Sequence, residues 1–231
     1  YIYNVCAIDS TSGASDIDLL EYKSYIYHMM LNSVDYFNNA QGEMVYAMNF
    51  DSPIEIEFQT DIDEQCSYEC LTQNGEIVEI NFVEDNVAYT VDAINCTYVS
   101  YSQGDVIEFS ISDNDRFVML DSGETLAVNR NDLTNLATAG KSCLFTPSYA
   151  MSYLSDFSSW NISGMENLCG RDCVIVDGTA NGNPFTMWID VNTGILMKYG
   201  DIEGYVQVDS IAIDENIEVN SFSFEMYTKA E

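Results

Sequence analysis

The segment PFTMWIDVNTGILMKYG (residues 184–200) has the pattern of a β-hairpin, and its two arms carry more apolar surface than a small hairpin can bury by itself. Apolar and polar side chains alternate along the first arm, which predicts that one face is buried. That face consists of Phe185, Met187 and Ile189. The DVNTG between the arms supplies the Asp and Gly of a tight turn. The apolar face must therefore meet a sealed core, a partner or a ligand.

The composition of the chain excludes several classes of protein. Its 231 residues are 47% hydrophobic and 13% aromatic, which is typical of a folded chain with a substantial core. Asp and Glu number 38 against 7 Lys and Arg, and the formal net charge is −31. Such a charge repels phosphate backbones, so nucleic acid is not an expected partner. The sequence contains no apolar run of 18 residues, so no membrane-spanning segment is expected.

The cysteines are odd in number and lack the paired C-x-x-C spacing of a zinc ribbon. They are Cys6, Cys66, Cys70, Cys96, Cys143, Cys169 and Cys173. Two interpretations stay open: buried thiols that pack as small hydrophobic groups, or one or more disulfides. Cys169 and Cys173 are the candidate pair, because a tight loop through Gly170 could bring their Cα atoms within the ~5.5 Å that a disulfide needs. With the acidic composition, the cysteines favour a secreted or cell-surface protein over a halophilic one.

The hydrophobic periodicity predicts one long helix followed mainly by strands. From Asp16, a candidate N-cap, apolar side chains recur at spacings of three and four residues as far as Phe37. Two short helices are expected at residues 131–140 and from Thr146 onward, with Pro147 in the first turn. The expected strands are residues 53–58, 66–72, 76–82, 86–92, 106–112, 117–121, 173–180, 185–190, 195–200 and 205–213.

A search for catalytic and cofactor motifs gives no support for an enzyme. His28 is the only histidine and is predicted to lie in the middle of a helix, away from any nucleophile motif. The sequence has no G-x-S-x-G, P-loop or dinucleotide-binding pattern, so no cofactor is expected. The acidic stretches SDNDR (112–116) and DID (61–63) lack the spacing of a calcium loop, so no metal site is expected either.

The stretch from Ser148 to Gly204 resembles bacterial periplasmic and surface proteins built on the LolA fold. These proteins include lipoprotein carriers, a domain of a sigma-factor regulator and lipid-carrying mycobacterial lipoproteins. The resemblance rests on a G-R-x-C/A-x-V-I strand followed by a W-I-D-x-x-T-G-x-L-x-K hairpin. The matching residues are Gly170, Arg171, Cys173, Val174, Trp188, Ile189, Asp190, Thr193, Gly194, Leu196 and Lys198. The chain departs from the family in its acidity and its many cysteines.

The resemblance implies an α+β fold: a single curved antiparallel β-sheet, or half-barrel, with helices covering the concave face and an apolar cavity between the two layers. Residues 1–15 are then an N-terminal lead and residues 16–231 the LolA-like domain. The side chains expected to line the cavity are Met30, Tyr149, Met151, Tyr153, Phe185, Met187 and Ile189. Unbranched methionine side chains suit a wall that must adapt to a ligand. An ordinary packed core is the alternative for the same residues.

We therefore expect a non-enzymatic, extracytoplasmic binding protein for a lipid, an acylated protein or another apolar ligand. It would be secreted, or anchored at the cell surface through a segment outside this chain, and monomeric. The alternative is a sensory or protein-interaction ectodomain of an anti-sigma-type regulator, in which the same fold binds a protein. An enzyme that acts through carboxylates ranks third.

Overall fold

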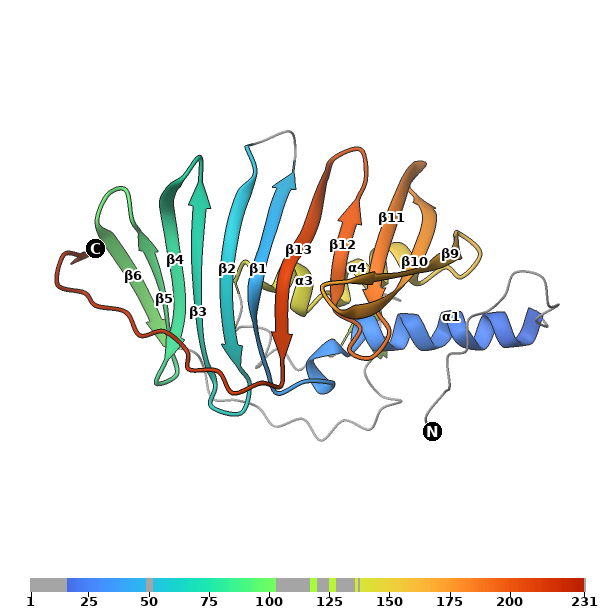
Figure 1. Cartoon of the computed structure of the whole chain (residues 1–231), viewed down its shortest axis with the longest axis horizontal. Coiled ribbons are helices and arrows are strands. Elements are labelled where there is room, and N and C mark those ends of the chain that lie inside the picture. Colours follow the sequence, from blue (N-terminus) through green and yellow to red (C-terminus); the bar gives the residue numbers. More distant parts are fainter. Residues whose placement is uncertain are drawn as a thin grey trace.

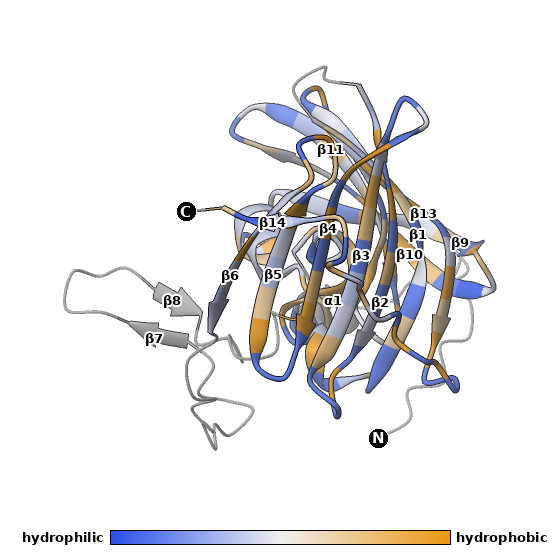
Figure 2. Cartoon of the chain, turned by 90° about the vertical axis from the view of Figure 1, so that its left-hand side faces the viewer, coloured by the Kyte–Doolittle hydropathy of each residue, from blue (hydrophilic) through white to orange (hydrophobic). Residues whose placement is uncertain are grey.

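A computed structural model describes residues 16–48, 52–102, 117–119, 125–127, 136 and 138–230. Its main element is one sheet of 12 strands in the order β14-β6-β5-β4-β3-β2-β1-β13-β12-β11-β10-β9 (Figure 1). All neighbouring strands are antiparallel except β14 and β6. Seen from the side of β6, the sheet curves around α1 (Asp16–Leu31), which lies within its concavity (Figure 2).

The strands of this sheet are β1 (Asn39–Met48), β2 (Ile54–Asp61), β3 (Cys66–Gln73), β4 (Glu76–Glu84), β5 (Val87–Asp92), β6 (Thr97–Ser102), β9 (Trp160–Leu168), β10 (Arg171–Ala180), β11 (Asn183–Asp190), β12 (Leu196–Gly200), β13 (Gly204–Ile213) and β14 (Thr228–Lys229). The strands β7 (Phe117–Met119) and β8 (Thr125–Ala127) form a separate pair.

The helical segments lie on the concave face of the sheet (Figure 1). Besides α1 they are η1 (Ser33–Asp35), α3 (Lys141–Leu144), α4 (Pro147–Tyr149) and the π-helical segment η2 (Ala150–Leu154). The fold is thus α+β, with a single open, curved sheet whose concave face carries the helices. This confirms the fold class expected from the sequence, except that β14 adds one short parallel pairing. Within the part of the chain that the structure describes, no helix is long and apolar enough to cross a membrane.

Helix α1 follows the predicted periodicity only in its second half. Ile26 and Met30 are fully buried, whereas Leu19, which the periodicity places on the same face, is 39% exposed. The helix ends at Leu31, and the predicted apolar face continues through η1 to Phe37, which stacks on Phe145 with ring centroids 5.7 Å apart. The apolar spacing therefore extends beyond the helix because the chain that follows stays against the same core.

Most of the predicted strands are present, and β1, β6, β8, β9 and β14 are additions that the sequence analysis missed. The strand predicted at residues 106–112 and most of the helix predicted at 131–140 lie outside the described residues. A short helix begins only at Lys141, after the predicted stop at Gly140. The predicted helix at Pro147 is present and continues as η2.

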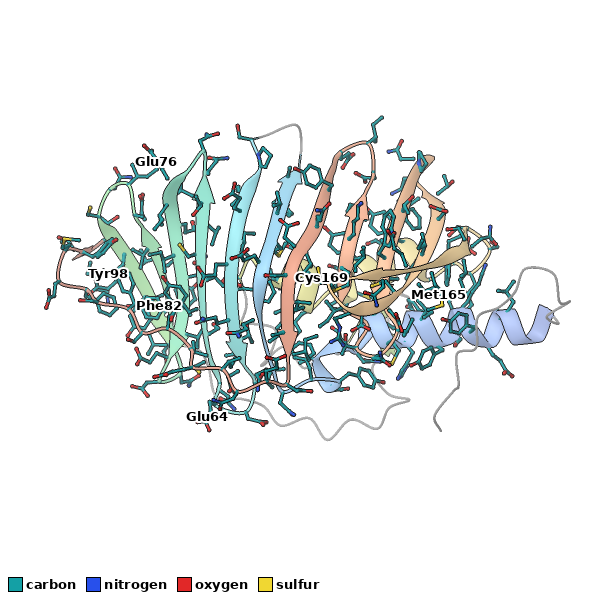
Figure 3. All side chains as sticks on the ribbon, in the orientation of Figure 1. Glu64, Glu76, Phe82, Tyr98, Met165 and Cys169 are labelled. Atoms are coloured by element: carbon teal, nitrogen blue, oxygen red, sulfur yellow. The ribbon has the colours of Figure 1, made fainter. Side chains whose placement is uncertain are left out.

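Two separate apolar clusters hold this arrangement together. The larger one lies between the concave face and the helices. The smaller one is centred on Ile80, Phe82 and Val91 and includes three aromatic side chains from the C-terminal segment, residues 214–227. In Figure 3 Phe82 and Tyr98 lie next to this segment, which crosses the outer face of β3–β6.

Candidate functional site

The turn between β11 and β12 is organised by a buried carboxylate. Asp190 has no exposed surface, and its Oδ2 accepts hydrogen bonds from Arg171 Nε at 2.5 Å and Thr193 Oγ1 at 2.6 Å. Its Oδ1 accepts from the backbone N–H of Asn192 at 3.1 Å. A buried carboxylate must be paired and hydrogen-bonded, and this one is. Arg171, Asp190 and Thr193 of the family-like motif therefore form one structural network.

The same turn docks against the C-terminal end of α1. Gly194 has a φ of +73°, and a Cβ atom added there would lie 2.1 Å from the carbonyl oxygen of Met29. Tyr25 donates a hydrogen bond from its hydroxyl to the Val191 carbonyl at 2.9 Å. The motif thus closes one end of the helical layer onto the sheet, because only glycine permits both this backbone conformation and this approach.

A buried lysine holds the first half of α1 in place. Lys23 is 6% exposed, and its Nζ donates to the carbonyl oxygens of Phe157, at 2.8 Å, and of Trp160. Nζ also lies 4.8 Å from the centre of the Trp160 ring. Burial lowers the pKa of Lys23. Carbonyl and π contacts compensate in part for the loss of solvation.

The interior between the layers contains four of the residues predicted to line a cavity. Met30, Met187 and Ile189 have no exposed surface, and Phe185 is 3% exposed. The ring of Phe185 lies over Gly178, where an added Cβ would come within 2.5 Å of it. The structure therefore brings the hairpin face and α1 into one apolar cluster.

The other three predicted residues lie on the covering helices. Tyr149, Met151 and Tyr153 are half-buried and pack against the same cluster. The ring of Tyr153 stands edge-on to Phe185 with centroids 4.9 Å apart and stacks on Tyr149 at 5.9 Å. These side chains therefore lie at the border of the interior rather than within it.

A hydrogen-bonded group of tyrosines stands at this border. The hydroxyl oxygens of Tyr153 and Tyr199 are 2.7 Å apart, and Tyr199 donates to Asp201 Oδ2. The ring of Tyr149 meets Tyr199 edge-on at 5.1 Å. Burial is the main cause that raises the pKa of both Tyr149 and Tyr199. These phenols therefore stay protonated and neutral at neutral pH. We call Tyr149, Tyr153, Tyr199 and Asp201 the tyrosine rim.

A second buried carboxylate fixes the start of α3 to the sheet. Glu69 on β3 is 1% exposed and accepts hydrogen bonds from the backbone N–H groups of Thr138, Ala139 and Gly140 at 3.1, 2.8 and 2.7 Å. Burial raises the pKa of Glu69, while the three N–H groups and Lys141 act in the opposite direction. These hydrogen bonds attach the segment that leads into α3 to strand β3.

The predicted disulfide partners lie in different surroundings. Cys169 occupies the tip of the β9–β10 hairpin, beside β13 (Figure 3), and its Sγ lies 3.5 and 3.3 Å from the carbonyl oxygens of Val208 and Asp209. Cys173 is fully buried, with its Sγ 3.5 Å from the Arg171 carbonyl oxygen. Both are free thiols, as are the other four cysteines that the structure describes. A bond between the two stays a prediction and would require one of them to leave its present contacts.

The outer face carries two pockets of about 320 Å³, one over β1, β2 and β13 and the other over the same strands and β3. Their linings include Glu43, Glu57 and Asp209 together with Phe58 and Ile56. None of the residues predicted to line the cavity contributes to either pocket.

The sequence analysis missed several residues of the site. Tyr199 and Asp201 were not singled out. Tyr199 lies two residues after Met197 in the second hairpin arm, so it could have been assigned to the same buried face. Lys23 and Glu69 look like solvated charges in the sequence. Their burial depends on carbonyl and N–H groups more than 60 residues away, which no local pattern reveals.

The described fold is that of an open half-barrel with a helix-covered concave face. No protein-family model matches the chain, and no curated protein matches it. Among solved structures, the chain is similar to a chain of the Pseudomonas aeruginosa MucA/MucB complex, with 15% identity and a TM-score of 0.48. That match covers 86% of this chain and 59% of the other, so the present chain spans about three fifths of that protein.

Two further similarities involve the groups that the sequence resemblance pointed to. The Mycobacterium tuberculosis lipoprotein LppX matches with 13% identity and a TM-score of 0.46, over 89% of this chain and all of the other. A LolA superfamily protein from Nitrosomonas europaea matches with 8% identity and a TM-score of 0.27, over 94% and 99%. Because all three TM-scores are below 0.5, the fold is assigned from the strand order and helix placement of this chain itself.

Proposed function

We propose that this protein is a non-enzymatic binding protein that holds the apolar chain of a lipid, an acylated protein segment or a similar ligand between the sheet and its helical cover. The acidic, lysine-poor composition and the sequence resemblance support an extracytoplasmic location. The observation that carries the proposal is the nature of the interior: methionines from both layers meet in it.

The methionines come from four different elements. Met30 belongs to α1, Met44 to β1, Met187 to β11 and Met197 to β12, and each is at most 1% exposed. Unbranched thioether side chains have several low-energy conformations and can rearrange at small cost. An interior built in this way can admit an acyl chain where a core of β-branched side chains would resist it.

The apolar interior is bordered differently at the β11–β12 turn and at the tyrosine rim. The β11–β12 turn locks one end of the cover through Gly194 and Asp190. At the tyrosine rim, Tyr149 and Tyr153 are half-buried and lie on or beside a π-helical segment. Such segments are often found at functional sites. The rim is therefore the proposed entrance.

The direct test is a titration with long-chain ligands of several head groups, followed by displacement of an environment-sensitive apolar dye. We expect saturable binding to the wild type. Met187→Trp fills the proposed site and should abolish uptake with little loss of stability. If the interior is a sealed core, the same substitution overpacks it and costs about 1 to 3 kcal/mol.

A matched control keeps this test sharp. Met226 is 80% exposed on the C-terminal segment, so Met226→Trp adds the same side chain without entering the interior. It should leave both uptake and stability unchanged. A large loss of stability in Met187→Trp, together with no ligand binding by the wild type, would contradict the proposal.

That outcome would favour the second candidate, a protein-interaction ectodomain of a regulator. The outer-face pockets over β1, β2, β3 and β13 are the observation in its support, because they form hollows lined by the exposed carboxylates Glu43, Glu57 and Asp209, to which a protein partner could bind. In that case the interior is only a core.

A further inference from the structure

The tyrosine rim contains a directed chain of hydrogen bonds. Asp201 Oδ1 accepts from the backbone N–H groups of Glu203 and Gly204 at 2.7 and 3.0 Å, which fixes the carboxylate in its turn. Its Oδ2 accepts from the hydroxyl of Tyr199. The oxygen of Tyr199 lies in turn 2.7 Å from that of Tyr153. Three groups thus form one chain that runs from the β12–β13 turn to η2.

The carboxylate determines the direction of every bond in this chain. A phenol has one proton to donate, and a carboxylate only accepts. Because Tyr199 gives its proton to Asp201, its oxygen must accept the proton of Tyr153. Burial and the bond to Asp201 raise the pKa of Tyr199, so the proton stays in place at neutral pH. The oxygen of Tyr153 then has only lone pairs left for a further partner.

The free lone pairs of Tyr153 lie where the apolar interior meets the surface. The Tyr153 ring is half-buried and touches Phe185, whose side chain belongs to the interior. Among the described residues, no lysine, arginine or histidine forms an ion pair with Asp201. Lys198, which directly precedes Tyr199 and points to the other face of β12, lies over the Trp188 ring, with its Nζ 4.7 Å from the ring centre. The hydrogen-bond chain thus ends in an acceptor, and none of the described basic side chains forms an ion pair there.

We propose that the tyrosine rim selects apolar ligands whose head group donates a hydrogen bond, such as a hydroxyl or a protonated amine, over ligands that end in a carboxylate. This inference rests on the proposed function and specifies its ligand class. A carboxylate head group would face lone pairs at Tyr153 and the field of Asp201, which leaves it unpaired.

The experiment compares hexadecanol, hexadecylamine and hexadecanoate in the dye-displacement assay at a pH where the fatty acid is ionised. We expect the alcohol and the amine to bind at least about tenfold more tightly than the fatty acid. Equal or tighter binding of hexadecanoate would overturn the head-group inference and leave the proposed function intact. Failure of all three ligands to displace the dye would overturn both.

Two substitutions at the tyrosine rim test the direction of the hydrogen bonds. Tyr153→Phe keeps the ring but removes the acceptor, so hexadecanol should lose its advantage over hexadecanoate. Asp201→Asn can donate to Tyr199 through its amide, which reverses the chain and makes Tyr153 the donor. Its affinity for hexadecanoate should therefore rise several-fold.

The control is Tyr101→Phe, which changes an exposed tyrosine on β6, outside both buried clusters and at the opposite end of the sheet. It should bind all three ligands as the wild type does. A native thermal unfolding profile confirms that each variant is folded. An unchanged ligand preference in Asp201→Asn would contradict the directed chain.

Discussion

The half of the sheet that contains β9–β13 and the half that contains β3–β6 differ in which face is covered by other parts of the chain. In the first half the concave face packs against the helical layer: α3 contacts β12 and β13, and η2 contacts β10 and α1. In the second half the outer face is also covered, because Phe222, Phe224 and Tyr227 of the C-terminal segment pack on Phe82 and its neighbours.

The contacts that hold the two covers differ in kind. The helical cover depends on three individual residues: Gly194, whose lack of a Cβ allows close approach, the carboxylate of Asp190 and the ammonium of Lys23. The C-terminal cover depends on a group of rings, in which Phe224 lies 5.7, 5.3 and 4.7 Å from the ring centres of Phe82, Tyr89 and Tyr98. A single substitution in the first half should therefore lower the free energy of unfolding strongly, whereas a single substitution in the second half should lower it less.

The largest effect is expected at the docking turn. Gly194→Ala places a Cβ against the Met29 carbonyl and forces alanine into a left-handed conformation. The free energy of unfolding should fall by roughly 3 to 5 kcal/mol in chemical denaturation. Gly182→Ala is the matched control, because Gly182 has a φ of +85° and open space around it. It should cost about 1 kcal/mol. Similar losses in both variants would show that the approach to α1 is unimportant.

The next effect is expected at Glu69, which connects the two halves. Glu69→Gln replaces a carboxylate that accepts three backbone N–H bonds, so the free energy of unfolding should fall by about 2 to 3 kcal/mol near pH 5. The measurement is urea unfolding of the wild type and the variant at a series of pH values.

The pH dependence of this difference has a definite sign. Burial raises the pKa of Glu69 in the folded protein above its unfolded value of about 4.3. Between these two values the folded state binds more protons than the unfolded state, so the free energy of unfolding falls as the pH rises. The amide that replaces the carboxyl in Glu69→Gln does not titrate, and the gap between wild type and variant should therefore narrow toward pH 8. A gap that widens would mean that the N–H groups outweigh burial.

A smaller effect is expected in the C-terminal cover. Phe224→Ala removes one ring from the aromatic group and should cost about 1 to 2 kcal/mol. Met226→Ala, two residues away and 80% exposed, should cost almost nothing. Amide hydrogen exchange should show faster exchange in residues 214–229 of Phe224→Ala while β9–β13 stay protected. Loss of protection throughout the sheet would show that the two covers are not independent.

The two halves were not equally accessible from the sequence. In the hairpin at 184–200, strict alternation identified Phe185, Met187 and Ile189 as one buried face, and the structure buries all three. Local patterns work there because a strand with one covered face alternates. Local patterns also located β2, β3, β4, β5, β10, β12 and β13, so the two halves differ in how well the buried side chains, rather than the strands, could be predicted.

Alternation failed where a strand is covered on both faces. Along β4, Ile80, Asn81, Phe82 and Val83 are all buried, so neither face of this part of the strand alternates with solvent. The side chain of Asn81 donates to Glu79 and accepts from Thr90, which satisfies it in the interior. The cover responsible for the outer face comes from residues 214–227, about 140 positions later in the chain. No window of sequence around β4 contains that information.

The smallest energetic effect is expected at the cysteine that the sequence paired with Cys173. Cys169 is exposed at a hairpin tip where its φ is +52° and that of Gly170 is +80°. Cys169→Ser should change the free energy of unfolding by less than about 0.5 kcal/mol, because a surface substitution removes no packing.

Alkylation of the native protein should label Cys96 and Cys169 first, and Cys143 and Cys173 last, because the latter two are fully buried. Burial also raises the pKa of Cys173 to about 12, so its thiol is not ionised at neutral pH. A Cys169–Cys173 disulfide would give the opposite results: a mass lower by two hydrogens, no labelling of Cys169, and a loss of about 2 to 4 kcal/mol in Cys169→Ser.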